Sequence, residues 1–199
     1  EKTNKEKELK YVENLRTLIE NAVKSRLQSD APVGSCLSGG IDSSVIVEQI
    51  NKLLNKGNSG GIGTVQKTFT SCFKNEKVDE ENWAKIVIDD TKTEWHKTYP
   101  NSNDFVKDFE DLIYTQDVPF FSTSTYSQYR VMKLAKENGV KVTLDGQGAD
   151  ELFAGYPIYM SSYIANSISK CDIKSVFKSV KHLDTTFSNI NTLFKQPLK

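Results

Sequence analysis

Short apolar runs alternate with helical patterns along most of this chain, and this alternation constrains the fold more than any other feature. Strand-like runs lie at residues 33–37, 67–73, 94–99 and 140–144. Apolar residues at helical spacing lie at residues 42–54, from 79, from 103, at 125–138 and from 149 onward. Strands that alternate with helices in this way predict an α/β fold with a parallel sheet.

An amphipathic pattern over residues 5–28 precedes the first predicted strand, and its apolar side includes Leu9, Val12, Leu15 and Leu18. Because water solvates such a stripe poorly, we expect this helix to pack on an apolar surface.

Several further side chains carry local expectations. Trp83, Phe105 and Phe109 lie on the apolar side of predicted helices and are expected in the core. Asn103 or Asp104 is expected to cap the helix that contains Phe109. Arg130 is expected on a solvated helix face, with a phosphate or a substrate carboxylate as its alternative partner.

Charge and hydropathy exclude several classes of protein. The 26 Lys and Arg residues balance 26 Asp and Glu residues, so the chain as a whole has no attraction to nucleic acid or to an anionic membrane. No apolar run approaches the roughly 20 residues that span a bilayer. Cys36, Cys72 and Cys171 are widely spaced, which is typical of reduced thiols in a cytoplasmic protein. We therefore expect small-molecule substrates and neither a nucleic acid nor a membrane as partner.

A glycine-broken loop, Ser38–Ser44 (SGGIDSS), follows the first predicted strand, where parallel sheets bind ligands. Adjacent glycines let the backbone approach an anion, while serine hydroxyls and the N–H groups of the helix start can donate to phosphate oxygens. Asp42 would repel a bare phosphate unless a divalent cation lies between them. An ordinary strand-to-helix turn is the alternative, but the whole heptapeptide favours a metal-assisted phosphate site.

A second glycine-broken loop, Asp145–Tyr156 (DGQGADELFAGY), follows the fourth predicted strand. Its glycines allow a close backbone turn, and Asp150 and Glu151 open a helix whose dipole favours carboxylates. Paired acids can also serve only as a helix cap. Together with Asp42, however, Asp150 indicates a two-carboxylate magnesium site, because Mg²⁺ in proteins commonly takes one or two carboxylates plus substrate phosphates and water.

The two motifs resemble those of the asparagine synthetases. SGGIDSS is similar to the SGGxDS loop of the N-type ATP pyrophosphatases, also called PP-loop enzymes, and the second motif is similar to the GxGADELFxGY segment of the asparagine synthetases. The motifs lie about 100 residues apart in the expected order, and a weaker resemblance covers about residues 8–165. The resemblance implies a three-layer adenine nucleotide alpha hydrolase-like fold, with ATP and Mg²⁺ as the cofactors. It also implies adenylation of a carboxylate with release of pyrophosphate.

The same resemblance implies roles for individual residues. Pyrophosphate would be held by Ser38, Gly39, Gly40, Asp42 and Ser43. The rest of the nucleotide would contact Leu37, Ser71, Phe73 and Gly146. Asp42 and Asp150 would bind the magnesium ion, and Glu151 would shape the acceptor side or orient its helix.

Gln147 departs from the family pattern, because asparagine synthetases generally have Glu at this place. An amide can hydrogen-bond but cannot act as a base. Gln147 joins Asp42, Asp150 and Glu151 as a candidate catalytic residue, while the acceptor stays open between aspartate and another carboxylate. The alternatives are a different PP-loop amidotransferase, such as a β-lactam-forming or sugar-amidating relative, and a non-catalytic nucleotide-binding module.

The resemblance implies an AMP-forming, amide-forming ligase that receives ammonia from glutamine. We expect residues 1–30 to form a helix on the domain, residues 31–165 to form the synthetase domain, and residues 166–199 to be its helical, truncated continuation. The processed N-terminal cysteine nucleophile of the family's glutaminase domain cannot be placed in this sequence, and neither can the later catalytic lysine of the family's synthetase domain. We therefore expect a glutaminase domain in the full-length chain.

Overall fold

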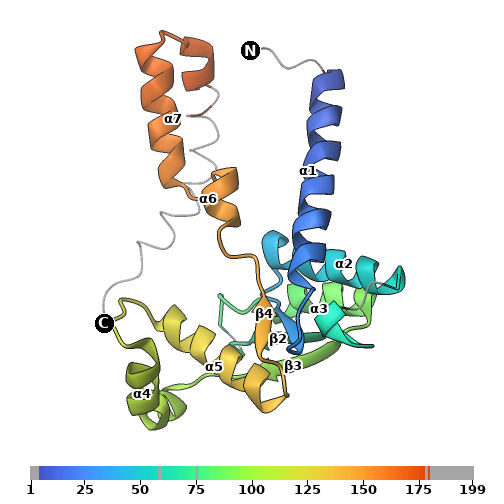
Figure 1. The fold of residues 1–199 in the computed structure, drawn as a ribbon. Helices are drawn as coiled ribbons and strands as arrows, with labels where there is room; N and C mark the ends of the chain where they lie inside the picture. The colour runs from blue at the N-terminus through green and yellow to red at the C-terminus, as the bar shows by residue number, and fades with distance from the viewer. Residues whose placement is uncertain (1–4, 58–59, 75, 178, 180–199) are drawn as a thin grey trace. The chain divides into compact units, whose positions relative to one another are not determined.

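The computed structural model describes residues 5–57, 60–74, 76–177 and 179. The chain divides into two compact units, Glu1–Gln147 and Gly148–Lys199. The first unit contains α1 (Lys5–Arg26), β1 (Val33–Cys36), α2 (Ile41–Asn55), η1 (Gly60–Ile62), β2 (Lys67–Ser71), α3 (Glu81–Thr91), β3 (Glu94–Thr98), α4 (Ser102–Gln116), α5 (Thr123–Glu137) and β4 (Val142–Leu144), where η1 is a short 3-10 helix (Figure 1). The second unit contains α6 (Ala149–Phe153) and α7 (Ile158–Ser169). Most of the helical continuation predicted for 166–199, from residue 180 onward, lies outside the described residues.

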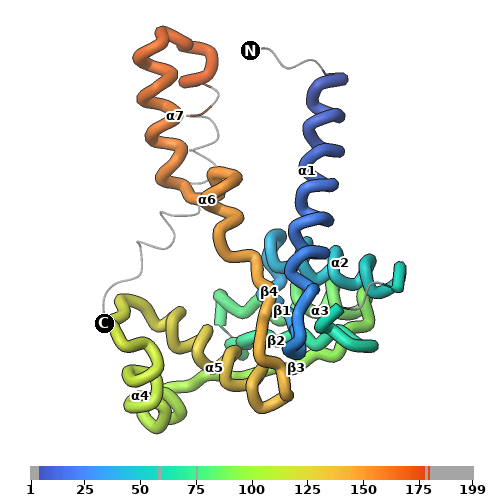
Figure 2. The backbone as a smooth tube through the Cα atoms, viewed as in Figure 1, coloured from blue at the N-terminus to red at the C-terminus, as the bar shows by residue number. Residues whose placement is uncertain are grey.

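The four strands form one parallel sheet in the order β3-β2-β1-β4. On β1, Ser35 lies opposite Thr68 of β2 on one side and opposite Leu144 of β4 on the other. The chain runs outward from β1 through β2 to β3 and then returns to the far side of β1 as β4 (Figure 2). The strand order therefore reverses between β1 and β4, and open α/β sheets bind their ligands at such switch points.

Helices cover both faces of this sheet. On one face, Leu37 packs with Val47 of α2 and Ala84 of α3. On the other face, Phe69 of β2 packs with Val131 and Ala135 of α5. Neighbouring residues of a strand point to opposite faces, so both faces of the short apolar strands are buried. The predicted α/β fold, with a parallel sheet between two helical layers, is confirmed (Figure 1).

The first helix packs on the sheet unit only through its end. Val23 of α1 and the following Leu27 are 3% exposed and belong to a cluster with Ile50 of α2. The predicted burial of the whole apolar stripe is wrong, because Leu9, Val12, Leu15 and Leu18 are 39–65% exposed. A helix of 22 residues is about 33 Å long, which is more than the end of α2 can cover.

Two other local expectations need correction. The cap of α4 is Asn101, whose side chain accepts a hydrogen bond from the Asp104 backbone, so the observed cap lies two residues before Asn103 and three before Asp104. Trp83 and Phe109 are 64% and 43% exposed, so the prediction that they belong to the core is wrong. None of the helices in the described part of the chain combines the length and the hydropathy that a membrane crossing requires.

Candidate active site

The loop after β1 is held in place by short polar contacts. The Leu37 N–H donates to the Phe69 carbonyl at 2.9 Å, and the Leu37 carbonyl accepts from the Thr70 hydroxyl at 2.7 Å. Beyond this point the Ser38 N–H donates to Ser43 Oγ at 3.2 Å, and the hydroxyl oxygens of Ser38 and Ser43 lie 3.0 Å apart. These contacts fold the loop back over the first turn of α2.

The first turn of α2 has no side-chain cap. Its N-cap residue is Gly40, which makes no side-chain hydrogen bond to the helix. Gly39, with φ of +89°, packs so closely on α3 that a Cβ there would lie 2.6 Å from the Ala84 nitrogen. An uncapped helix start beside flexible glycines leaves N–H groups that can bind an anion.

The loop after β4 lies directly against the loop after β1. A Cβ at Gly146 would lie 2.7 Å from the Asp42 Cβ and 2.8 Å from the Ser43 nitrogen, so only glycine fits between the two loops. Asp145 Oδ1 accepts a hydrogen bond from the Gln147 backbone at 3.1 Å. Asp42 itself is half-buried and makes no hydrogen bond or ion pair with another residue of the described chain. The structure thus brings Asp42, Ser43 and Gly146 together.

Asp150 and Glu151 belong to the second compact unit. The Asp150 carboxyl group lies against Gly155, whose N–H donates to the Asp150 carbonyl at 2.9 Å. Glu151 Oε1 accepts from the Tyr156 hydroxyl at 3.0 Å, and this bond raises the pKa of Tyr156. The motif therefore forms a tight local turn around α6, and joint binding of one magnesium ion by Asp42 and Asp150 stays a prediction.

A cleft of about 820 Å³ opens at the carboxyl ends of β1 and β2. Of the predicted site residues it is lined by Leu37, Ser38, Ser71, Phe73 and Gln147. The Ser71 hydroxyl is buried and has no hydrogen-bond partner among the described residues. Leaving such a group unpaired costs about 1–3 kcal/mol, and a ligand in the cleft would supply the missing partner.

The opposite wall of the cleft was not predicted from the sequence. It is formed by the starts of α4 and α5, through Asn101, Ser102, Phe105, Ser122, Thr123, Ser124, Tyr126, Ser127 and Gln128. The available signal was the Ser- and Thr-rich run at 122–127, because hydroxyl side chains concentrated at one helix start exceed what a single cap requires.

A charged network behind this wall joins α4 to α5. Asp108, which is 8% exposed, accepts hydrogen bonds from Tyr126 at 3.0 Å, Arg130 at 2.8 Å and Lys133 at 2.8 Å. Burial alone would raise the pKa of Asp108, but these three donors outweigh it and lower the pKa to about 2. Arg130 therefore pairs with Asp108, has a side chain that is 24% exposed and does not line the cleft, whereas the sequence suggested a solvated face or a ligand as its partner.

Cys72, Asp79 and Glu81 form one further cluster, with ligand atoms within 4.8 Å of one another. Asp79 already accepts hydrogen bonds from the backbones of Phe73 and Glu81, and Glu81 pairs with Lys97 at 2.9 Å. Burial and the two neighbouring carboxylates raise the pKa of Cys72 to about 12. A thiol that stays protonated is a poor metal ligand, so this cluster stabilises the loop after β2.

Known proteins that share this sequence pattern identify the family. The family model described as asparagine synthase matches residues 14–195. A putative asparagine synthetase [glutamine-hydrolyzing] 2 of Methanocaldococcus jannaschii is 35% identical over 161 residues, which cover 81% of this chain and 30% of the relative. Asparagine synthetase [glutamine-hydrolyzing] 1 of Bacillus subtilis is 33% identical over 150 residues, which cover 75% of this chain and 22% of the relative.

A third relative has a different name. Amidase chyE of Penicillium rubens is 27% identical over 164 residues, which cover 79% of this chain and 24% of the relative. The chain thus spans less than a third of the length of each of these proteins. The family model nevertheless covers most of the chain, and the chain belongs to the asparagine synthase family.

Proposed function

We propose that this chain is the nucleotide-binding part of an ATP-dependent, amide-forming ligase. In the proposed reaction a carboxylate oxygen of the acceptor attacks the α-phosphorus of ATP, and pyrophosphate leaves. Ammonia then attacks the acyl carbon of the adenylate, AMP leaves, and a proton is released with the amide product. Family membership supports this reaction type.

One observation carries the proposal: the cleft contains a buried, unpaired hydroxyl and reaches Ser38, which lies next to the uncapped start of α2. The first turn of α2 offers N–H groups beside the Ser38 and Ser43 hydroxyls. The Ser71 hydroxyl, on the adjacent strand, needs a partner from the cleft. A phosphate-bearing molecule with a hydroxylated sugar satisfies both features, since helix starts bind phosphate and a ribose hydroxyl can pair with serine.

The residues present also fit a magnesium ion. Asp42 is a carboxylate at a helix start, and no residue of the described chain neutralises it. Carboxylate oxygens are the ligands that Mg²⁺ prefers, and the ion would neutralise phosphate charge next to Asp42. We propose Asp150 as the second carboxylate.

This chain's own contribution is positioning and charge stabilisation. The α2 N–H groups with Ser38 and Ser43 would hold the departing pyrophosphate, while Leu37 and Phe73 would flank the base at the strand ends. Fixed donors aimed at developing charge, together with correct orientation, supply a large part of enzymatic rate enhancement. Gln147 would orient a substrate by hydrogen bonding and would take no proton.

Further parts of the proposal concern the whole protein. The relatives' names include glutamine hydrolysis, so we propose that ammonia comes from glutamine in a glutaminase domain of the full-length chain. The segment boundaries near residues 30 and 165 and the cytoplasmic location remain predictions. The acceptor is left open by these relatives, because one of them is named an amidase.

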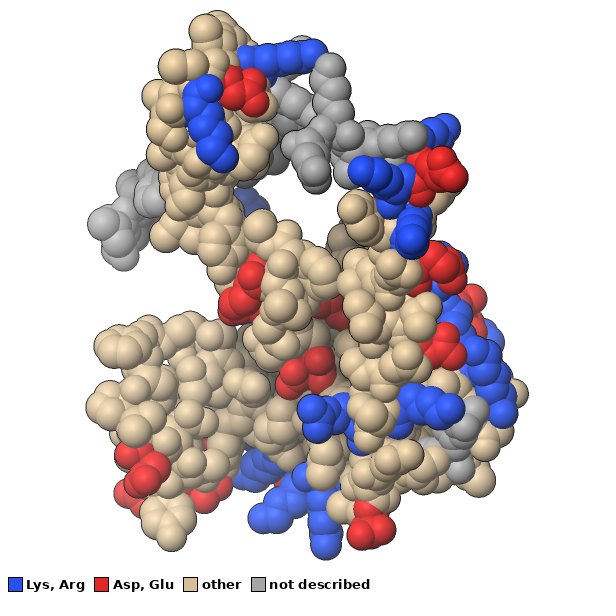
Figure 3. Space-filling view, turned by 45° about the horizontal axis from the view of Figure 1, so that its top comes forward, with Lys and Arg blue, Asp and Glu red and all other residues tan. Residues whose placement is uncertain are grey.

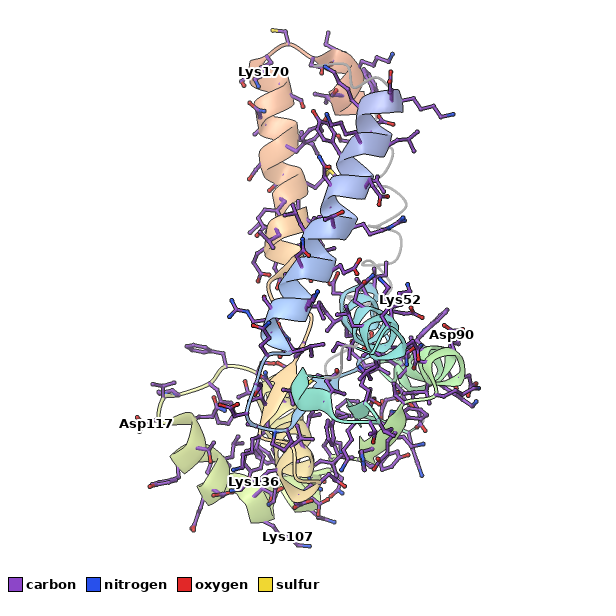
Figure 4. All side chains as sticks on the ribbon, turned by 45° about the vertical axis from the view of Figure 1, so that its right-hand side comes forward. Lys52, Asp90, Lys107, Asp117, Lys136 and Lys170 are labelled. Atoms are coloured by element: carbon purple, nitrogen blue, oxygen red, sulfur yellow. The ribbon has the colours of Figure 1, made fainter. Side chains whose placement is uncertain are left out.

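The test is nucleotide binding followed by pyrophosphate exchange. Calorimetric titration with ATP should show binding that tightens when Mg²⁺ is added. Asp42→Asn should reduce ATP–pyrophosphate exchange by about 100-fold or more, the usual effect of removing a charge-stabilising group. Asp90→Asn, the same change at the exposed end of α3 (Figure 4), is the matched control. Undiminished exchange in Asp42→Asn would refute the role of Asp42.

A further inference from the structure

The start of the phosphate loop, residues 38–44, is fixed to the sheet by a side chain of β2. The paired residues of β1 and β2 end at Cys36 and Phe69. At the next residue of the chain, the Leu37 carbonyl accepts a hydrogen bond from the Thr70 hydroxyl at 2.7 Å. Leu37 is 1% exposed, and a backbone carbonyl that water cannot reach needs a partner within the protein. The Thr70 side chain supplies that partner where the pairing of the strands ends.

Trp95 of β3 fixes the direction in which the Thr70 hydroxyl donates. The Trp95 Nε1–H group donates to Thr70 Oγ1 at 2.8 Å, and an indole nitrogen can only donate. The single proton of the Thr70 hydroxyl is therefore left for the Leu37 carbonyl. The ammonium group of Lys97 lies 4.2 Å from the centre of the Trp95 ring, and this cation–π contact helps to hold the ring in place.

The peptide between Leu37 and Ser38 carries this constraint into the loop. A peptide C=O and the N–H that follows it lie in one plane, so a fixed Leu37 carbonyl also fixes the direction of the Ser38 N–H. That N–H donates to Ser43 Oγ at 3.2 Å. The proton of the Ser43 hydroxyl is then available to the Gly40 carbonyl, to Ser38 Oγ or to a phosphate oxygen. Ser43 is one of the serines proposed above to hold pyrophosphate.

This relay lies inside the protein. Lys, Arg, Asp and Glu side chains are scattered over the face drawn in Figure 3, whereas Leu37 and Thr70 are each 1% exposed and Ser43 is 7% exposed. Hydrogen bonds in such surroundings polarise one another and are stronger than the same bonds in water. Without the Thr70 hydroxyl, the Leu37–Ser38 peptide would lose the contact that sets its orientation.

We infer that Thr70 is a positioning residue for the phosphate loop. It acts on the Ser43 hydroxyl through the Leu37–Ser38 peptide, and it does not line the cleft. The inference rests on the proposed function, because it assumes that this loop holds the pyrophosphate of ATP. The Thr70 hydroxyl should therefore affect the binding of the pyrophosphate part of ATP and leave the binding of the base and ribose unchanged.

The test compares the binding of Mg-ATP with that of AMP, which lacks the pyrophosphate, to the full-length protein by calorimetry. Thr70→Val removes the hydroxyl and keeps a β-branched side chain of similar size. It should weaken Mg-ATP binding by about tenfold, the size of effect expected from one lost hydrogen bond, and leave AMP binding unchanged. Thr70→Ser, which keeps the hydroxyl, should restore Mg-ATP binding.

Thr68→Val is the matched control. Thr68 lies two residues earlier on the same face of β2 and is 0% exposed. Its hydroxyl donates to the Glu94 carbonyl at 3.2 Å and has no contact with the phosphate loop. This variant loses a buried hydroxyl of the same kind, so it should bind Mg-ATP as the unchanged protein does.

The outcomes separate this inference from the proposed function. Unchanged Mg-ATP binding by Thr70→Val would overturn the inference and leave the proposed function intact. An equal loss of Mg-ATP and AMP binding, or an equal loss in Thr68→Val, would also overturn it, since either result assigns the effect to the sheet as a whole. Failure of the unchanged protein to bind Mg-ATP would overturn the proposed function and the inference together.

A second variant decides the matter if circular dichroism shows that Thr70→Val does not fold. Trp95→Phe removes the N–H group that donates to Thr70 and keeps an aromatic ring at this place. A loss of Mg-ATP binding without a loss of AMP binding in this variant supports the relay. Unchanged Mg-ATP binding in this variant overturns it.

Discussion

Replacement of Asp108 by Asn should destabilise the first compact unit in a manner that depends on pH. Asp108 is 8% exposed and receives hydrogen bonds from Tyr126, Arg130 and Lys133. An asparagine has nearly the same shape but lacks the negative charge. Because two of the three donors are cations, the variant leaves their charges uncompensated at the contact between α4 and α5.

The magnitude follows from the proton affinity of the carboxyl group. The pKa falls from about 3.9 in an unfolded chain to about 2 in the folded protein. A tenfold change in proton affinity is worth about 1.4 kcal/mol, so ionised Asp108 stabilises the folded unit by about 2–3 kcal/mol. Since the folded pKa is depressed, this stabilisation is complete well above pH 4 and is lost as the pH falls toward 2. By pH 3 about half of it is gone.

Urea unfolding followed by tryptophan fluorescence measures this effect directly, because Trp83 and Trp95 both lie in the first unit. The free energy of unfolding of Asp108→Asn should be about 2–3 kcal/mol below that of the unchanged protein at pH 6, and the difference should halve by pH 3. Asp90→Asn, at an exposed position, controls for the loss of one charge. A difference that stays constant from pH 6 to pH 3 would refute the assignment to the ionised carboxylate.

Three further predictions concern the cleft and the cysteines. Gly146→Ala should weaken ATP binding at least tenfold without loss of helix content, since the Cβ of the new alanine would displace the backbone at Ser43. The control is Gly63→Ala, whose added Cβ meets open space; it should leave the ATP affinity measured by calorimetry unchanged. Ser71→Ala should raise the free energy of unfolding by about 1 kcal/mol in urea, because it removes a buried unpaired hydroxyl, and should also weaken ATP binding several-fold; a loss of stability would contradict the first part. At pH 8 a chromogenic disulfide reagent should react with one thiol in the folded protein and with three after unfolding. Burial raises the pKa of Cys36 to about 11 and that of Cys72 to about 12, while Cys171 is exposed. Rapid reaction of a second thiol in the folded protein would show that Cys36 or Cys72 is accessible.

Local pattern was enough to predict the sheet, because β1 and β2 are short runs buried on both faces and helical apolar periodicity separates the successive strands. The same pattern failed for Trp83 and for the first half of α1, where apolar residues recur at helical spacing but are exposed. Periodicity predicts which side of a helix is apolar; it does not reveal how far the neighbouring layer extends. The length of that layer depends on contacts between residues distant in the sequence, such as Val23 with Ile50.

The candidate site also has one part that the sequence predicted and one part that it did not. Asp42 and Gly146 meet because β1 and β4 are neighbours in the sheet. The glycine-broken loops that follow these two parallel strands therefore lie side by side. The α4–α5 wall was missed, because its residues come from two helix starts about 20 positions apart and share no motif. The role of Arg130 was missed for a related reason: its partner Asp108 lies on another helix, 22 residues earlier.

The family match therefore says more about nucleotide binding than about the identity of the acceptor. The loop after β1 would contact what every reaction of the proposed type has in common, a nucleoside triphosphate, so its motif predicts ATP binding and leaves the acceptor open. Relatives named asparagine synthetase and amidase are therefore both compatible with the same two loops.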